Sequence, residues 1–203
     1  KSSKLFTLLN SGDGNLEQRF ASDFEYLLSV PHSLEAADFN GDGFKDLAVS
    51  YADQGKIQIY WNNGSGWWTE LSEVYSDGAD PFCMCSGDFN GDGIKDMLGF
   101  AHNNVVVHLG ELKGNNKDKA RLGYGSNWLS QMTKGKGGWN SDKHPRMTGD
   151  VTGDGLADII GFASKNVAVA VNTGKDFIPA KNWHNGMGSS GGWKLHRSLL
   201  RLK

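Results

Sequence analysis

An acidic stretch of ten residues occurs three times in the chain, and this repeat limits the possible folds more than any other feature. The copies read DFNGDGFKDL from Asp38, DFNGDGIKDM from Asp88 and DVTGDGLADI from Asp150. Their starting points are 50 and 62 residues apart. Two short apolar runs follow each copy, such as LAVSYA and then KIQIYW after the first. A succession repeated at this spacing indicates a chain built from one structural unit used several times.

Each unit contains about four short strand-like segments and no convincing helix. Several of these segments, such as VVV at 105–107 and VAVAV at 167–171, are apolar on both faces. A strand of that kind is covered on both sides. Four strands in about 50 residues, packed between neighbours, are typical of one blade of a β-propeller. A β-sandwich seldom repeats its sequence so closely, and a β-helix needs shorter repeats, so we predict an all-β propeller of four-stranded blades.

The repeat begins and ends out of phase with the chain. KLFTLLNSGDGNL near the N-terminus reads as the second strand and turn of an earlier unit, and KLHRSLLRL near the C-terminus reads as a first strand. We therefore expect residues 1–203 to form a single propeller domain or a propeller fragment, built of repeats of about 50–60 residues. It would hold three whole blades and one blade split between the termini, or it would be part of a larger ring. A second copy or another propeller chain as a partner stays open.

Oxygen-bearing side chains alternate along each acidic stretch. In the first copy they occupy positions 1, 3, 5 and 9, with Gly43 at position 6. This is the ligand pattern of an EF-hand calcium loop without its final glutamate. The backbone carbonyl of position 7 would add a ligand. The predicted ligands are Asp38, Asn40, Asp42, Phe44 and Asp46, then Asp88, Asn90, Asp92, Ile94 and Asp96, and finally Asp150, Thr152, Asp154, Leu156 and Asp158.

These loops predict about three Ca²⁺ sites that stabilise the fold. The alternative is a set of polar hairpin turns, because Asn-Gly and Asp-Gly are ordinary turn formers. Retention of the position-9 aspartate in all three copies favours the metal. Thr152 stands where the other copies have asparagine, which predicts a third site that is weaker or that uses a water ligand.

The loops, with the Gly-Phe pairs at 99–100 and 161–162, resemble the FG-GAP/VCBS repeats of integrin-α-type propellers. The segment GGWNSDKHPRMTGDVTGDGLADIIGF, from residue 137, is similar to the repeats of Psathyrella velutina-type fungal lectins. That resemblance implies a seven-bladed, calcium-containing propeller that binds N-acetylglucosamine and sialic acid between blades. The units before Asp38 and Asp88 lack the GGW…KHPR segment, which implies fewer sugar sites than blades.

The repeated segment NW…GGW…KH-R carries the groups that a sugar site needs, namely a flat aromatic face and fixed polar donors. The candidates are Trp128, Trp139, Lys143, His144, Arg146, Trp183 and Trp193. Two alternatives stay open, because a tryptophan between blades can serve packing alone and His144 can cap a loop carbonyl. Ser198 stands where the last copy would have histidine, which predicts an altered site there.

The remaining sequence features exclude several functional classes. A formal net charge of −2 offers no basic surface for nucleic acid, and no apolar run approaches the ~20 residues that span a bilayer. No Ser/His/Asp or H-E-x-x-H pattern is found, and the carboxylates concentrate in the predicted metal loops. We therefore predict a non-enzyme. Cys83 and Cys85 are two residues apart, and we interpret them as two buried thiols.

These features predict a calcium-stabilised, non-catalytic lectin whose partners are glycans or glycoproteins. The alternative is an integrin-like adhesion or protein-interaction module of a larger secreted protein or toxin. We expect an extracellular location, because calcium sites of this type fill where calcium is millimolar. The glycosylation sequon that begins at Asn63, on a predicted turn, is compatible with secretion.

Overall fold

The structure, a computed structural model, describes the chain from residue 6 to residue 187 with several gaps. The described residues are 6–10, 12–13, 15–20, 30–62, 64, 68–75, 83–111, 121–140 and 143–187. They form three four-stranded antiparallel sheets and two two-stranded hairpins, and no α-helix occurs among them. The all-β prediction is confirmed. Within this part of the chain, no helix is long and apolar enough to cross a membrane.

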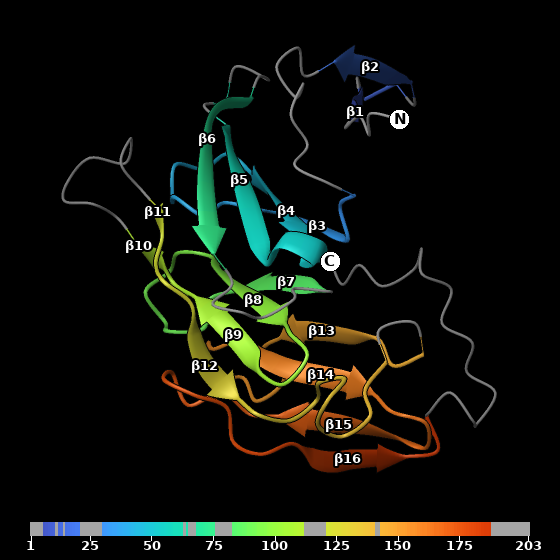
Figure 1. The fold of residues 1–203 in the computed structure, drawn as a ribbon. Coiled ribbons are helices and arrows are strands. Elements are labelled where there is room, and N and C mark those ends of the chain that lie inside the picture. The colour runs from blue at the N-terminus through green and yellow to red at the C-terminus, as the bar shows by residue number, and fades with distance from the viewer. Residues whose placement is uncertain are drawn as a thin grey trace.

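Each four-stranded sheet is a meander whose strands follow chain order (Figure 1). The first sheet contains β3 (Ser33–Ala37), β4 (Asp46–Tyr51), β5 (Lys56–Asn62) and β6 (Trp68–Tyr75), with a 3₁₀ turn, η1 (Ala52–Gln54), between β4 and β5. The second contains β7 (Met84–Gly87), β8 (Asp96–Phe100), β9 (Val105–His108) and β12 (Ser126–Leu129). The third contains β13 (Arg146–Gly149), β14 (Asp158–Phe162), β15 (Asn166–Ala170) and β16 (Lys181–Asn185). Each sequence repeat thus corresponds to one four-stranded sheet.

Two hairpins accompany these sheets. The first, β1 (Phe6–Asn10) with β2 (Leu16–Phe20), precedes the first sheet. It corresponds to the partial unit expected at the N-terminus. The second, β10 (Gly110–Glu111) with β11 (Arg121–Leu122), is inserted between β9 and β12. KLHRSLLRL, the expected first strand at the C-terminus, lies outside the described residues.

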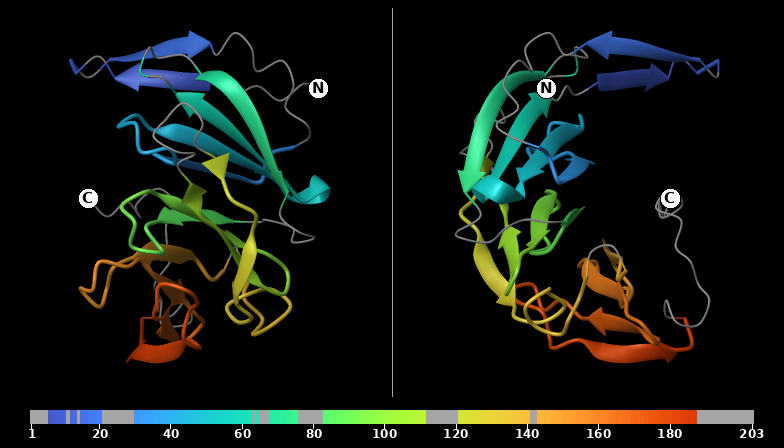
Figure 2. Two further views of the ribbon diagram at one scale, coloured as in Figure 1. Left: turned by 90° about the vertical axis from the view of Figure 1, so that its left-hand side faces the viewer. Right: turned by 45° about the vertical axis from the view of Figure 1, so that its right-hand side comes forward.

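The first strands of the three sheets lie next to one another. β7 contacts β3 on one side and β13 on the other. Hydrogen bonds join the three strands, because Ser86 Oγ donates to Glu35 Oε1 at 2.6 Å and Thr148 Oγ1 donates to the Ser86 carbonyl at 2.7 Å. The sheets fan out from these strands in an arc (Figure 2), which is a β-propeller-like arrangement. The described residues do not close this arc into a ring, so the number of blades stays a prediction.

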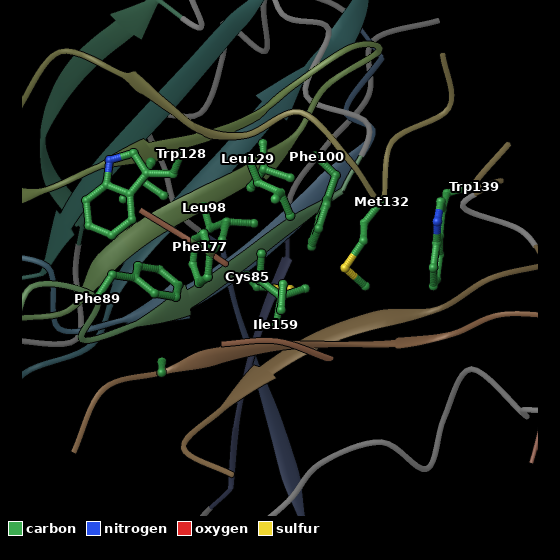
Figure 3. Packing of buried hydrophobic residues seen from close by; sticks show 14 of the residues in the cluster. Cys85, Phe89, Leu98, Phe100, Trp128, Leu129, Met132, Trp139, Ile159 and Phe177 are labelled. Atoms are coloured by element: carbon green, nitrogen blue, oxygen red, sulfur yellow. The ribbon is translucent and has the colours of Figure 1, made fainter. Parts of the chain in front are cut away.

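Apolar side chains fill the spaces between adjacent sheets. Ala48, Ile57 and Ile59 of the first sheet meet Met84 and Met97 of the second. The larger cluster, between the second and third sheets, is shown in Figure 3. Its members include Cys85, Leu98, Phe100, Val105, Val107, Trp128, Ile159, Ala168 and Phe177.

The strand β8 shows why its sequence is apolar on both faces. Met97 lies in the cluster towards the first sheet, and the next residue, Leu98, lies in the cluster towards the third. Successive side chains of a strand point to opposite faces, so a sheet between two neighbours needs both sets to be apolar. Cys83 and Cys85 are free thiols, as expected, but only Cys85 is buried and Cys83 is half-buried.

Candidate functional site

The three acidic stretches are loops between the first and second strands of the sheets. In the first loop, the carboxylate of Asp38 accepts hydrogen bonds from the backbone N–H groups of Asp42 at 3.1 Å and Gly43 at 2.9 Å. Asp42 accepts one from Phe44 N–H at 2.8 Å. Gly41 and Gly43 have φ angles of 68° and 94°, a left-handed region that favours glycine. The second and third loops repeat this pattern from Asp88 and Asp150.

The aspartate at position 9 begins the second strand of each sheet and is fully buried. Asp96 accepts hydrogen bonds from Phe89 N–H at 2.7 Å and from Gly110 N–H at 2.8 Å. Asp46 and Asp158 make the equivalent pairs of bonds. Each carboxylate therefore ties the start of its loop to the end of the third strand. Burial raises the pKa of Asp46 and Asp96 to about 6, and the accepted N–H bonds offset part of that rise.

The donor set of these loops fits a hard cation in its chemistry. Every predicted side-chain ligand is an oxygen, and each loop offers three carboxylates, which is what Ca²⁺ prefers. Within the described residues, however, no three His, Cys, Asp or Glu side chains are grouped closely enough to hold a metal ion. The loop carboxylates instead accept bonds from loop N–H groups. Calcium therefore stays a proposal.

Two of the candidate tryptophans lie in the core between the second and third sheets. Trp128 on β12 is 8% exposed, and its ring lies 5.7 Å from that of Phe177. Trp139 is 9% exposed. Its ring packs over Gly161, where a Cβ would come within 2.5 Å of it, and stands beside Met132 (Figure 3). These positions favour the packing interpretation for both side chains.

Arg146 at the start of β13 also points inward. Its guanidinium lies 4.5 Å from the centre of the Phe100 ring, and Nη1 donates to the Met132 carbonyl at 2.8 Å. Met132 has a φ of 56°, which is strained for a residue with a side chain. The arginine therefore holds the strained turn against the second sheet, and its charge does not face solvent.

His144 lies at the edge of this core and bridges two loops. Its Nδ1 accepts a hydrogen bond from Asn140 N–H at 3.0 Å, so Nε2 carries the proton and donates to Ser164 Oγ at 2.9 Å. Its ring meets that of Trp139 edge-on, with centroids 5.7 Å apart. Partial burial lowers the pKa of His144, and the charges of Arg146 and Lys143 lower it further.

The remaining candidates differ in their exposure. Lys143 is exposed, and Trp183 on β16 is 50% exposed. Trp193 lies outside the described residues. The structure thus brings Trp139, His144 and Arg146 together at one loop, with Lys143 beside them in the chain.

Sequence reasoning missed three residues of these sites. Ser164 holds His144, Phe177 packs on Trp128, and Asn172 joins the second and third acidic loops. Asn172 opens the polar turn NTGKD, which resembles NNGSG in the first unit, so a signal existed. Its contacts with another loop depend on how the sheets stack, and no spacing within one unit could predict them.

Comparison with known proteins supports the repeat and the fold. Residues 38–99 match the FG-GAP-like repeat family. The chain superposes on an Agrocybe aegerita lectin, described as specifically recognising non-reducing terminal N-acetylglucosamine, with a TM-score of 0.69 and 25% identity. The match covers 93% of this chain and 48% of the lectin, so the chain spans about half of that protein. No curated protein matches by sequence.

A second solved structure shares the fold. This is the Tc holotoxin pore of Photorhabdus luminescens, with a TM-score of 0.50 and 20% identity over 86% of this chain and 8% of that one.

The family match and the lectin structure confirm the two expected resemblances, to FG-GAP repeats and to a fungal lectin. The chain carries an FG-GAP-like repeat within an all-β, propeller-like fold shared with about half of a fungal lectin.

Proposed function

We propose that this protein is a non-catalytic lectin that binds glycans ending in N-acetylglucosamine or sialic acid. The observation that carries the proposal is the similarity, over 93% of this chain, to a lectin that recognises terminal N-acetylglucosamine. The chain adds an exposed polar loop between two sheets, whose backbone is held by Trp139, His144 and Arg146. A rigid loop of this kind can present hydrogen-bonding groups to a sugar at low entropic cost.

The sugar contacts are assigned by exposure. Among the candidates, Lys143 is exposed on this loop and His144 is half-buried beside it, and Trp183 is the described candidate tryptophan with half of its surface in solvent. An aromatic face packs against the C–H groups of a sugar ring, and a cationic side chain suits the carboxylate of sialic acid. Trp139 and Arg146 then hold the loop that carries Lys143 from within.

Calcium binding at the three acidic loops forms part of this proposal. The support is the oxygen-only donor set, repeated with its glycines in all three loops. Bound ions would neutralise clustered carboxylates and tie each loop to its sheet, a structural role. An extracellular location follows from the calcium concentration that such sites need.

The test is a glycan array on the calcium-loaded protein, followed by calorimetry with N-acetylglucosamine and with sialyllactose. We expect specific binding that weakens in Trp183→Ala and Lys143→Ala. Lys175→Ala, an exposed lysine on another turn, is the matched control and should bind like the parent. A folded, calcium-loaded protein that binds no glycan would overturn the lectin proposal.

An adhesion or protein-interaction module of a larger secreted protein or toxin is the second candidate. It is favoured by the family match, which falls on residues 38–99, a segment without the GGW…KHPR unit. A partner that stays bound after enzymatic removal of its glycans would support this function over the first.

A further inference from the structure

In each sheet, a residue near the end of the third strand closes the acidic loop, and the three positions are equivalent. Asn62, Gly110 and Asn172 lie at or just after the end of the third strand. The backbone N–H of each donates to Oδ1 of the buried aspartate of its own loop, at 3.0, 2.8 and 2.8 Å respectively. The backbone arrangement is thus the same three times, and only the side chains differ.

The two asparagines share most of their side-chain contacts. Asn62 Nδ2 donates to the Lys45 carbonyl of the first loop at 3.1 Å, and Asn172 Nδ2 donates to the equivalent Ala157 carbonyl of the third loop at 2.9 Å. Their Oδ1 atoms accept from the N–H groups of Gly64 and Gly174. Each amide therefore fastens its own loop to the turn after the third strand.

Asn172 makes one further bond, to a different loop. Its Nδ2 also donates to the Phe89 carbonyl of the second loop at 3.0 Å, and its side chain is buried, with 3% of its surface exposed. The second sheet has Gly110 at this position. A Cβ there would lie 2.7 Å from Ile94 Cγ2 and 2.9 Å from the Lys95 carbonyl, so no amide fits between the first and second loops in that way.

Further contacts strengthen the junction between the second and third loops. Ala157 N–H donates to the Asp88 carbonyl at 3.0 Å, so consecutive carbonyls of the second loop are held by residues of the third unit. Leu156 Cδ2 approaches Gly91, where a Cβ would lie 3.2 Å away. At the junction of the first two loops the corresponding contact, Ile94 with Gly41, is looser, at 3.9 Å.

We infer that Asn172 is a positioning residue that couples the second and third loops, so that their metal sites fill as a pair while the first loop fills independently. This inference rests on the proposed calcium binding. An ion that orders the third loop also fixes Ala157 and Asn172, and through them the Asp88 and Phe89 carbonyls at the start of the second loop. These carbonyls are then ordered before the second loop binds its own ion, so filling the second site costs less conformational entropy. This is positive cooperativity.

The experiment compares Asn172→Ala with Asn62→Ala in the full chain. Both variants lose the bond to their own loop and the bond from the glycine N–H, and only Asn172→Ala loses a bond to another loop. Hydrogen exchange of the loop amides in EDTA reports the coupling without metal. Calorimetric Ca²⁺ titration, with loop assignment by exchange protection, reports its effect on binding.

We expect Asn172→Ala to speed exchange of the second-loop amides, and to weaken Ca²⁺ binding to the second loop by about fivefold or more. Asn62→Ala should change the first loop alone. Unchanged second-loop exchange in Asn172→Ala, or equal second-loop effects of the two variants, would overturn the coupling. If the parent protein binds no Ca²⁺, the metal proposal fails separately, and exchange alone decides the coupling.

A second variant covers the case in which Asn172→Ala does not fold. Asp154→Asn removes one carboxylate from the exposed tip of the third loop. Coupling predicts that this change also weakens Ca²⁺ binding at the second loop, by about fivefold or more, and leaves the first loop as it was. Equal affinities of the second loop in Asp154→Asn and in the parent would contradict the inference.

Discussion

The buried aspartates at position 9 show how one side chain can decide the closure of a whole loop. Asp96 has no exposed surface. One carboxylate oxygen accepts a hydrogen bond from Phe89 N–H at the start of the loop, and the other accepts one from Gly110 N–H after the third strand. Buried polar groups need hydrogen-bond partners, because a buried group without one destabilises the fold by its full desolvation free energy. The loop geometry therefore depends on this carboxylate whether or not a metal binds.

Asp96→Asn is expected to destabilise the protein by about 1–3 kcal/mol, because the new NH₂ group would face a buried N–H that loses its acceptor. Urea unfolding in EDTA measures this change apart from any metal effect. Asp92→Asn, on the exposed tip of the same loop, serves as the control and should cost less than about 0.5 kcal/mol. Equal costs for the two variants would contradict the argument.

His144 should be neutral, with its proton on Nε2, at neutral pH. Partial burial and the charges of Arg146 and Lys143 lower its folded-state pKa below 6.5. The stability contributed by the neutral ring is therefore present above pH 6.5 and is lost as the pH falls through the folded-state pKa. Protonation of Nδ1 would break its bond with Asn140 N–H.

Nuclear magnetic resonance of the imidazole nitrogens measures both properties of His144. We expect the Nε2–H tautomer and a pKa below 6.5, with exchange at the Asn140 amide speeding up as the ring becomes protonated. An Nδ1–H tautomer would show that the bond from Asn140 N–H does not form in solution. A pKa at or above 6.5 would contradict the effects of burial and of the Arg146 and Lys143 charges.

At the scale of elements, the loop between β12 and β13 is held by packing on a glycine of the neighbouring strand. Gly161 on β14 has no side chain, and the Trp139 ring and Met132 occupy the space where a Cβ would stand. Interiors are packed so closely that one added methyl group forces side chains or backbone to move. The position of the proposed sugar loop thus depends on a residue that no sugar would touch.

Gly161→Ala is expected to destabilise the protein by about 1–3 kcal/mol and to raise the exposure of Trp139. Gly149→Ala is the matched control on β13, because a Cβ there would lie 3.8 Å from Ile160, an ordinary contact. Thermal unfolding and tryptophan fluorescence quenching follow the two changes. Equal stability of both variants would show that the loop does not rely on this contact.

For the whole molecule, bound calcium should stabilise the fold by holding each acidic loop in place. An ion that binds only the folded state stabilises it by mass action, by about 2.7 kcal/mol for one site filled at 100 times its Kd. For a chain of this size that corresponds to about 5–10 °C in Tm. Excess EDTA should lower the Tm by this order and Ca²⁺ should restore it. A melting curve unaffected by EDTA would refute a structural role for the metal.

The sequence alone determined the fold class and the loops. A repeat with two-sided apolar strands predicts stacked four-stranded sheets, because periodicity and turn chemistry act over a few neighbouring residues. Tertiary structure decided the rest. Trp128, Trp139 and Arg146 have the residue types of a sugar site, yet they lie inside because the second and third sheets pack together around them. Asn62 and Asn172 look alike in sequence, and only the stacking of the sheets sets Asn172 against the Phe89 carbonyl of another loop. Burial and contacts between units depend on which surfaces meet, and no local pattern contains that information.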